Sequence, residues 1–134
     1  MKARTVSVWV GLLALVLGVL ACGGSVSTAN VADAWMSADE AGESRVTSYA
    51  QDAVFYAQAD LKNAPDDTAI KAVWTAVEVA DTEPGLVLEE SELTAGSGHV
   101  HFTLSYDSLW PTGSYRVDIY LGEELVKTLE FTVQ

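Results

Sequence analysis

The 134-residue chain carries 19 acidic and seven basic residues, which gives a net charge of −12 at neutral pH. Such a negative field repels the phosphates of nucleic acid and the headgroups of an anionic lipid surface, so charge attraction to either is excluded. Cys22 is the single cysteine, which excludes an intramolecular disulfide.

The first 22 residues resemble an export signal followed by a modification site. Lys2 and Arg4 precede an apolar run from Val8 to Ala21, which is shorter than the roughly 20 residues of a membrane-spanning helix and suits the core of a secretory signal. The run closes with Val19-Leu20-Ala21-Cys22, which resembles the bacterial lipobox, with leucine at the middle position as a mild departure. The resemblance implies cleavage before Cys22, a thioether-linked lipid on its sulfur, and a fatty acyl chain such as palmitate on its new amino terminus.

These features predict a signal peptide over residues 1–21 and a lipid-anchored protein of the bacterial cell envelope, with its domain outside the cytoplasm. The mature chain would have 113 residues, the size of one small domain, and a net charge of −14. Acyl chains on Cys22 would therefore have to supply the membrane attachment, since each buried methylene contributes about 0.8 kcal/mol.

Residues 22–45 are rich in small and polar types, which predicts a flexible spacer after the lipidated cysteine. Val31, Trp35 and Met36 are apolar enough to suggest a first edge strand within it.

From Val46 onward, apolar and polar residues alternate with a period of two, which is typical of an antiparallel sheet. Residues 55–61 form the first clear strand and end at a turn. Residues 69–79 form the next one and place Trp74 at the predicted centre of the core. Residues 86–94 read as a more polar strand, whose glutamates suit an exposed edge because charge discourages pairing with another chain.

The C-terminal third continues the alternation. Residues 98–105 place His99 and His101 on the outward face of one strand. Residues 115–121 and 125–133 are predicted to form a hairpin, because a short glycine and glutamate turn joins them.

About seven short strands favour an all-β, immunoglobulin-like Greek-key sandwich over residues 46–134, with a barrel as the alternative. Trp74 in an early central strand agrees with this fold. So does the segment from Leu109 through Trp110 to Tyr115, which resembles a tyrosine corner, in which the tyrosine hydroxyl bonds to backbone a few residues upstream. Core or corner packing is expected of Trp110. The simpler alternative makes Tyr115 an ordinary aromatic strand residue.

Three segments together are similar to a widespread group of uncharacterised bacterial lipoproteins with an immunoglobulin-like domain. They are Asn63-Ala64-Pro65 through Trp74, the run from Trp110 to Leu121, and Phe131-Thr132-Val133. The resemblance covers roughly residues 46–134 and implies the fold, but it implies no catalytic residue. Some members carry names implying a small quinol oxidase subunit, although nothing in this chain resembles a haem, copper or quinone site.

His99 and His101 share a strand face, where two imidazoles could hold zinc or copper with help from carboxylates of a neighbouring strand. The carboxylates considered are Glu89, Glu90 and Glu92. Two histidines alone are a weak signal, and ordinary surface residues beside a glycine turn are the simpler interpretation, so no metal or other cofactor is predicted.

The remaining candidate site residues give weaker indications of a ligand or a reaction. Asp66-Asp67 and Glu123-Glu124 lie at turns, where acidic residues serve solubility, and no calcium-loop spacing accompanies them. Paired carboxylates for glycoside hydrolysis would need a pocket, and no serine occupies a nucleophile elbow. Trp35, Tyr56 and Tyr120 are left as contact aromatics, with Tyr120 on the outward parity of its strand.

The sequence therefore predicts a non-catalytic, lipid-anchored module with an envelope protein as its partner. The alternative is an accessory subunit of a membrane oxidoreductase, resembling a quinol oxidase, or of a transporter. A small hydrolase or carbohydrate binder is the third hypothesis.

Overall fold

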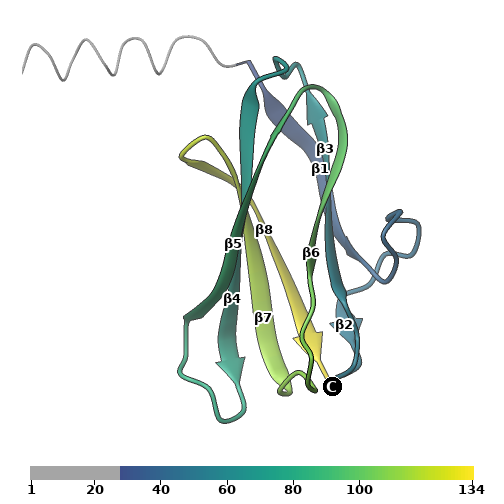
Figure 1. Cartoon of the computed structure of the whole chain (residues 1–134), viewed down its shortest axis with the longest axis vertical. Helices are drawn as coiled ribbons and strands as arrows, with labels where there is room; N and C mark the ends of the chain where they lie inside the picture. The colour runs from purple at the N-terminus through teal and green to yellow at the C-terminus, as the bar shows by residue number, and fades with distance from the viewer. Residues whose placement is uncertain (1–27) are drawn as a thin grey trace, which may run out of the picture.

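The computed structural model describes residues 28–134, which form two packed β-sheets (Figure 1). The strands in chain order are β1 Asn30–Ser37, β2 Ser48–Tyr49, β3 Phe55–Lys62, β4 Thr68–Val79, β5 Leu86–Ala95, β6 Gly98–Leu104, β7 Gly113–Leu121 and β8 Glu124–Val133. This described part contains no helix, which confirms the all-β prediction. Residues 28–134 accordingly offer no helix long and apolar enough to cross a bilayer.

The smaller sheet has three antiparallel strands in the order β1-β3-β6. Its edge strand β1 is the one that Val31, Trp35 and Met36 suggest, and it pairs along the length of β3 apart from a bulge between Val31 and Asp33. The sandwich thus takes in residues from Asn30 onward, in addition to the predicted range 46–134. Only seven residues separate Cys22 from β1.

The larger sheet has five strands in the order β2-β8-β7-β4-β5. The predicted hairpin is present as β7 and β8, and the short β2 adds to β8 in parallel. Because the chain passes from β3 to β4 and from β5 to β6 between the two sheets, the connectivity is of the Greek-key type. The barrel alternative is wrong, since each sheet ends at edges of its own.

An aromatic cluster joins the two sheets. Phe55 of β3 is fully buried, and its ring centroid lies 4.5 Å from that of Trp110, 4.8 Å from that of Phe131 and 4.9 Å from that of Tyr49. Trp74 of β4 is 1% exposed and stacks on Phe55 from the opposite sheet. Among the described residues, no acceptor takes a hydrogen bond from the buried Trp74 Nε1. Trp74 therefore contributes packing alone.

The segment before β7 has the geometry of a tyrosine corner. The Tyr115 hydroxyl donates a hydrogen bond to the Pro111 carbonyl at 2.5 Å, and burial raises the pKa of this hydroxyl, with a smaller contribution from Tyr106. Trp110 packs beneath the corner, and its Nε1 donates to the Ala53 carbonyl at 2.9 Å. The corner thus ties the β6–β7 connection to the β2–β3 connection without a disulfide.

Candidate functional site on the outer face of the three-stranded sheet

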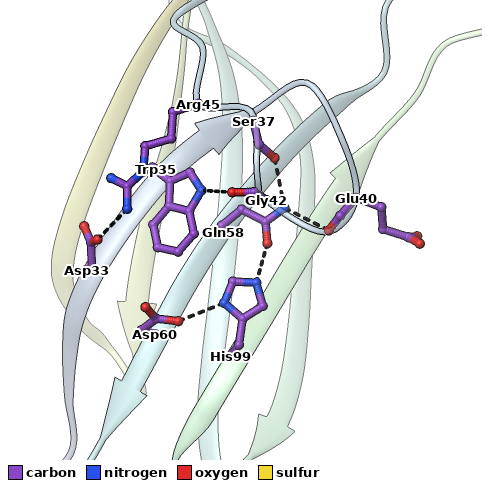
Figure 2. Close-up of polar contacts among 9 residues, drawn as sticks. All are labelled: Asp33, Trp35, Ser37, Glu40, Gly42, Arg45, Gln58, Asp60 and His99. Carbon is purple, nitrogen blue, oxygen red and sulfur yellow. Dashed lines mark hydrogen bonds and ion pairs between the residues drawn. The ribbon is translucent and has the colours of Figure 1, made fainter.

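The outer face of the three-stranded sheet collects polar side chains, because alternate residues of each strand point away from the core. On β3, Phe55 and Ala57 point inward, whereas Gln58 and Asp60 point outward. Gln58 is nevertheless 0% exposed. The reason is that residues 38–45, between β1 and β2, fold over Gln58 (Figure 2). We call residues 38–45 the cover loop.

Asp39 organises the cover loop from within. Its two carboxylate oxygens accept hydrogen bonds from the backbone N–H groups of Glu43, at 3.1 Å, and Ser44, at 2.9 Å. These bonds, with that of Ser44 the larger influence, hold the pKa of the Asp39 carboxyl below its usual value. A further bond joins the Ala38 N–H to the Ser44 carbonyl at 2.8 Å. The loop is therefore a closed turn with an ionised carboxylate at its centre.

Gly42 brings the loop into contact with the sheet. Its φ is +82°, and a Cβ at this position would lie 2.8 Å from Cδ of Gln58. Only glycine tolerates both the left-handed backbone and this close approach. The Gly42 carbonyl also accepts a hydrogen bond from Trp35 Nε1 at 2.9 Å.

The side-chain amide of Gln58 holds the loop from below. Its Nε2 donates toward three oxygens: Ser37 Oγ at 2.9 Å, the Glu40 carbonyl at 3.0 Å and the Asp39 carbonyl at 3.3 Å. The Ser37 hydroxyl itself donates to the Asp39 carbonyl at 2.7 Å, so Ser37 Oγ acts as an acceptor toward Gln58. Two of the three acceptors are backbone carbonyls, which fix the orientation of the amide.

Oε1 of Gln58 faces His99. The distance from Oε1 to His99 Nε2 is 2.6 Å, and His99 Nδ1 lies 2.8 Å from Oδ1 of Asp60 (Figure 2). The outward parity predicted for His99 is therefore correct, but its ring is engaged on both sides.

Trp35 lies between two cationic or potentially cationic groups. The Arg45 guanidinium carbon is 4.1 Å from the centroid of the Trp35 ring, and the His99 ring centroid is 5.6 Å away (Figure 2). Arg45 also pairs with Asp33 at 2.9 Å, which lowers the pKa of the Asp33 carboxyl. Trp35 is thus half-buried by neighbours on its own sheet face.

The carboxylates considered as partners for the two histidines are in the wrong place. Glu89, Glu90 and Glu92 lie on β5, which pairs with β4 in the five-stranded sheet, whereas both histidines lie on β6 in the other sheet. His101 instead faces Glu40 of the cover loop, with 3.6 Å between Nε2 and Oε2. Across residues 28–134, no three histidine, cysteine or acidic side chains gather where they could hold a metal ion.

The other candidates are scattered. Asp66-Asp67 lies in the β3–β4 turn, and Glu123-Glu124 lies in the β7–β8 turn at the start of β8. Tyr120 is half-buried on the outer face of the larger sheet, where the Lys71 ammonium lies 4.9 Å from its ring centroid, and Tyr56 is half-buried on β3. Cys22 lies outside the described residues.

Beside the cover loop, a groove of about 420 Å³ runs between β1 and β8, at the edge where the two sheets meet. Trp35 and Arg45 form one side of it, and Thr128 to Glu130 form the other. The groove is open to solvent, so it suits a contact with a partner surface better than enclosure of a small molecule.

Comparison with known proteins agrees with the fold. An immunoglobulin-like protein from Pseudomonas aeruginosa matches with a TM-score of 0.56 and 13% identity, over 82% of this chain and 99% of that one. A DNA-bound alkylpurine DNA glycosylase from Pseudomonas fluorescens matches with a TM-score of 0.54 and 12% identity, over 86% of this chain and 33% of that one. A β-glucosidase from Listeria innocua, in complex with laminaribiose, matches with a TM-score of 0.50 and 15% identity, over 76% of this chain and 16% of that one.

No protein-family model and no curated protein matches this chain. The chain spans a third or less of the two enzymes, and at these identities the likeness shows the fold alone. The prediction of an immunoglobulin-like β-sandwich is confirmed.

Proposed function

We propose that the protein is a lipid-anchored module of the bacterial cell envelope that binds an envelope protein and performs no chemistry of its own. The observation that carries the proposal is the tetrapeptide Val19-Leu20-Ala21-Cys22 after a short apolar run, upstream of an immunoglobulin-like sandwich. Such folds recur widely as binding domains, although fold alone does not assign a partner.

The position of β1 limits the distance between the proposed lipid anchor and the sandwich. Seven residues between Cys22 and Asn30 reach at most roughly 25 Å when fully extended. A spacer of 22–45 would have allowed the sandwich to stand much farther from the lipid. The proposed module is therefore held close to the membrane, where a partner in or on the membrane can reach its faces.

Metabolic labelling with an alkyne analogue of palmitate, followed by membrane fractionation, tests the anchor. We expect the wild-type chain to take up the label and to sediment with membranes, and Cys22→Ser to lose the label and normal processing. Ser25→Ala is the matched control, because it alters the adjacent segment and leaves Cys22 in place. A Cys22→Ser chain that is cleaved normally and stays fully membrane-bound contradicts the anchor.

Site-specific photo-crosslinking in intact cells tests the partner. A photoreactive residue at Glu43 probes the cover loop, and one at Thr128 probes the groove; Glu123, in the β7–β8 turn, is the comparison position. We expect the same protein adduct to recur from one of the first two positions. Recovery of the monomer alone from all three counts against a binding module. An adduct with an oxidoreductase or transporter subunit would instead support the accessory-subunit alternative.

A further inference from the structure

Both histidines of the chain are linked to the cover loop, one by a direct contact and the other through Gln58. His101 faces Glu40 directly, at 3.6 Å. His99 contacts Oε1 of Gln58, whose Nε2 in turn holds the Asp39 and Glu40 carbonyls. Two of the contacts between the cover loop and the sheet thus involve histidines, whose charge ordinarily changes between about pH 5 and pH 8. Trp35 and Ser37 make further contacts with the loop that involve no histidine.

The hydrogen-bond acceptors around His99 determine which protonation state of its ring they can accommodate. Oε1 of Gln58 accepts hydrogen bonds and donates none, and an ionised Asp60 carboxylate does the same. Both ring nitrogens of His99 lie within 2.8 Å of one of these acceptors. A neutral imidazole carries one N–H and can donate to one acceptor only. Only the imidazolium ring, with two N–H groups, satisfies both.

A rotation of the Gln58 amide does not remove this requirement. Exchange of Oε1 and Nε2 would place Oε1 against the Asp39 and Glu40 carbonyls, which offer no hydrogen, and would leave the Ser37 hydroxyl as the one donor among its three present partners. Gln58 is fully buried, so water does not replace the lost bonds, and each unsatisfied buried group is costly. The amide therefore stays in the orientation that presents an acceptor to His99.

We propose that protonation of His99 latches the cover loop, residues 38–45, onto the outer face of the three-stranded sheet through Gln58, and that loss of this proton loosens the loop. The His101–Glu40 pair adds to the latch in the same direction, because it is attractive only when His101 is charged. The latch does not depend on the proposed anchor or partner.

The charged groups around His99 are mostly acidic. The titratable groups on this face come from β1, the cover loop, β3 and β6: Asp33, Asp39, Glu40, Glu43, Arg45, Tyr56, Asp60, Lys62 and His101. Acidic groups outnumber the basic ones, and Arg45, the cation that contacts Trp35, is already paired with Asp33. The lowered pKa of Asp39 keeps its carboxylate charged through the range in which histidine titrates, so Asp39 is not the group whose charge changes.

The direction of the pH effect follows from linkage. A latch that requires bound protons is complete at acidic pH and is lost as pH rises through the titration of histidine, between about pH 5 and pH 8. His99 and Asp60 are both partly exposed, which limits the strength of their pair. We therefore expect a loss of roughly 1.5- to fivefold in the protection of the loop, the scale that partly screened ion pairs produce.

Amide hydrogen exchange of the full-length protein in detergent tests the latch. Protection factors, which are corrected for intrinsic exchange rates, are compared at about pH 5 and pH 8 for Gly42, Glu43 and Ser44, whose N–H groups are hydrogen-bonded within the loop. Ala72 in the core of β4 reports global unfolding and should change little. In the same samples, nitrogen NMR of the His99 ring should show both nitrogens protonated at the lower pH.

Two variants isolate the cause. His99→Gln should lower the protection of the loop at acidic pH to the wild-type value at alkaline pH and remove most of the pH dependence. Thr103→Ala, farther along the same exposed face of β6, is the matched control and should leave the pH dependence intact. Equal wild-type protection at both pH values, or full pH dependence in His99→Gln, overturns the proposal. If His99→Gln does not fold, the wild-type comparison and the ring nitrogens still decide the question.

Discussion

Trp110 and Trp74 can each be replaced by phenylalanine, and they differ in whether the indole N–H donates a hydrogen bond. Trp110 donates from Nε1 to the Ala53 carbonyl at 2.9 Å, whereas among the described residues Trp74 Nε1 has no acceptor. Both are well buried, at 6% and 1% exposure. Replacement by phenylalanine shortens each side chain by a similar volume, so the cavity cost, roughly 1–3 kcal/mol, is comparable for the two.

The two variants differ in what happens to the indole N–H. Trp110→Phe leaves the Ala53 carbonyl without its partner, which costs about 1–3 kcal/mol beyond the cavity. Trp74→Phe removes a buried donor that gains nothing from the fold, so about 1–3 kcal/mol of desolvation cost disappears and offsets the cavity. We expect Trp110→Phe to lower the free energy of unfolding by at least about 2 kcal/mol more than Trp74→Phe, although Trp74 is the more deeply buried.

Urea unfolding followed by far-ultraviolet circular dichroism measures this difference, because the signal does not depend on the tryptophans that are changed. The comparison is valid where the dependence on urea concentration is the same for both variants, so that midpoints report stability. A Trp74→Phe variant destabilised as much as Trp110→Phe would refute the reasoning, since hydrogen bonding would then have no part in the outcome.

Two tyrosines yield further predictions. Tyr115→Phe should lower the free energy of unfolding by about 1–3 kcal/mol, because it leaves the Pro111 carbonyl unpaired. Tyr120→Phe, on the outer face of the larger sheet, is the control and should lower it by less than about 0.5 kcal/mol. Equal losses of stability in urea unfolding would contradict the tyrosine corner. Burial raises the pKa of Tyr49 from 10.0 to about 12, so the unfolded chain releases this proton first and stability falls as pH rises between those values. Tyr49→Phe should reduce that slope by up to about 1.4 kcal/mol per pH unit, and an unchanged slope would rule out Tyr49 as its source.

Much of the sandwich could be predicted because alternation along a strand directly reflects burial on one side. In residues 55–61 every second residue is apolar, and the structure buries that set in the core. The same alternation located the β7–β8 hairpin, and Trp74 occupies the core position that its strand implies. The N-terminal limit was less clear, since a bulge between Val31 and Asp33 breaks the period of two within β1.

The candidate site could not be predicted from local pattern. Gln58 stands at an outward position between two other polar positions, which indicates a solvated side chain, and only the fold of the cover loop buries it. The carboxylates of β5 are close to His99 in the sequence but lie in the other sheet, because the chain changes sheets between Ala95 and Gly98. Proximity along the chain misleads wherever a strand changes sheets.

The division of the N-terminal segment between the two sheets has a mechanical consequence. β1 pairs with β3 in one sheet, the cover loop follows, and β2 pairs with β8 in the other (Figure 1). Tension applied to the chain ahead of Asn30 and directed along β1 would load the β1–β3 hydrogen bonds together, in shear, before it reached β2. Detachment of β1 would uncover Gln58 while the β4, β7 and β8 ladders stayed intact, so a pull on the N-terminus would act first on the face that carries the cover loop.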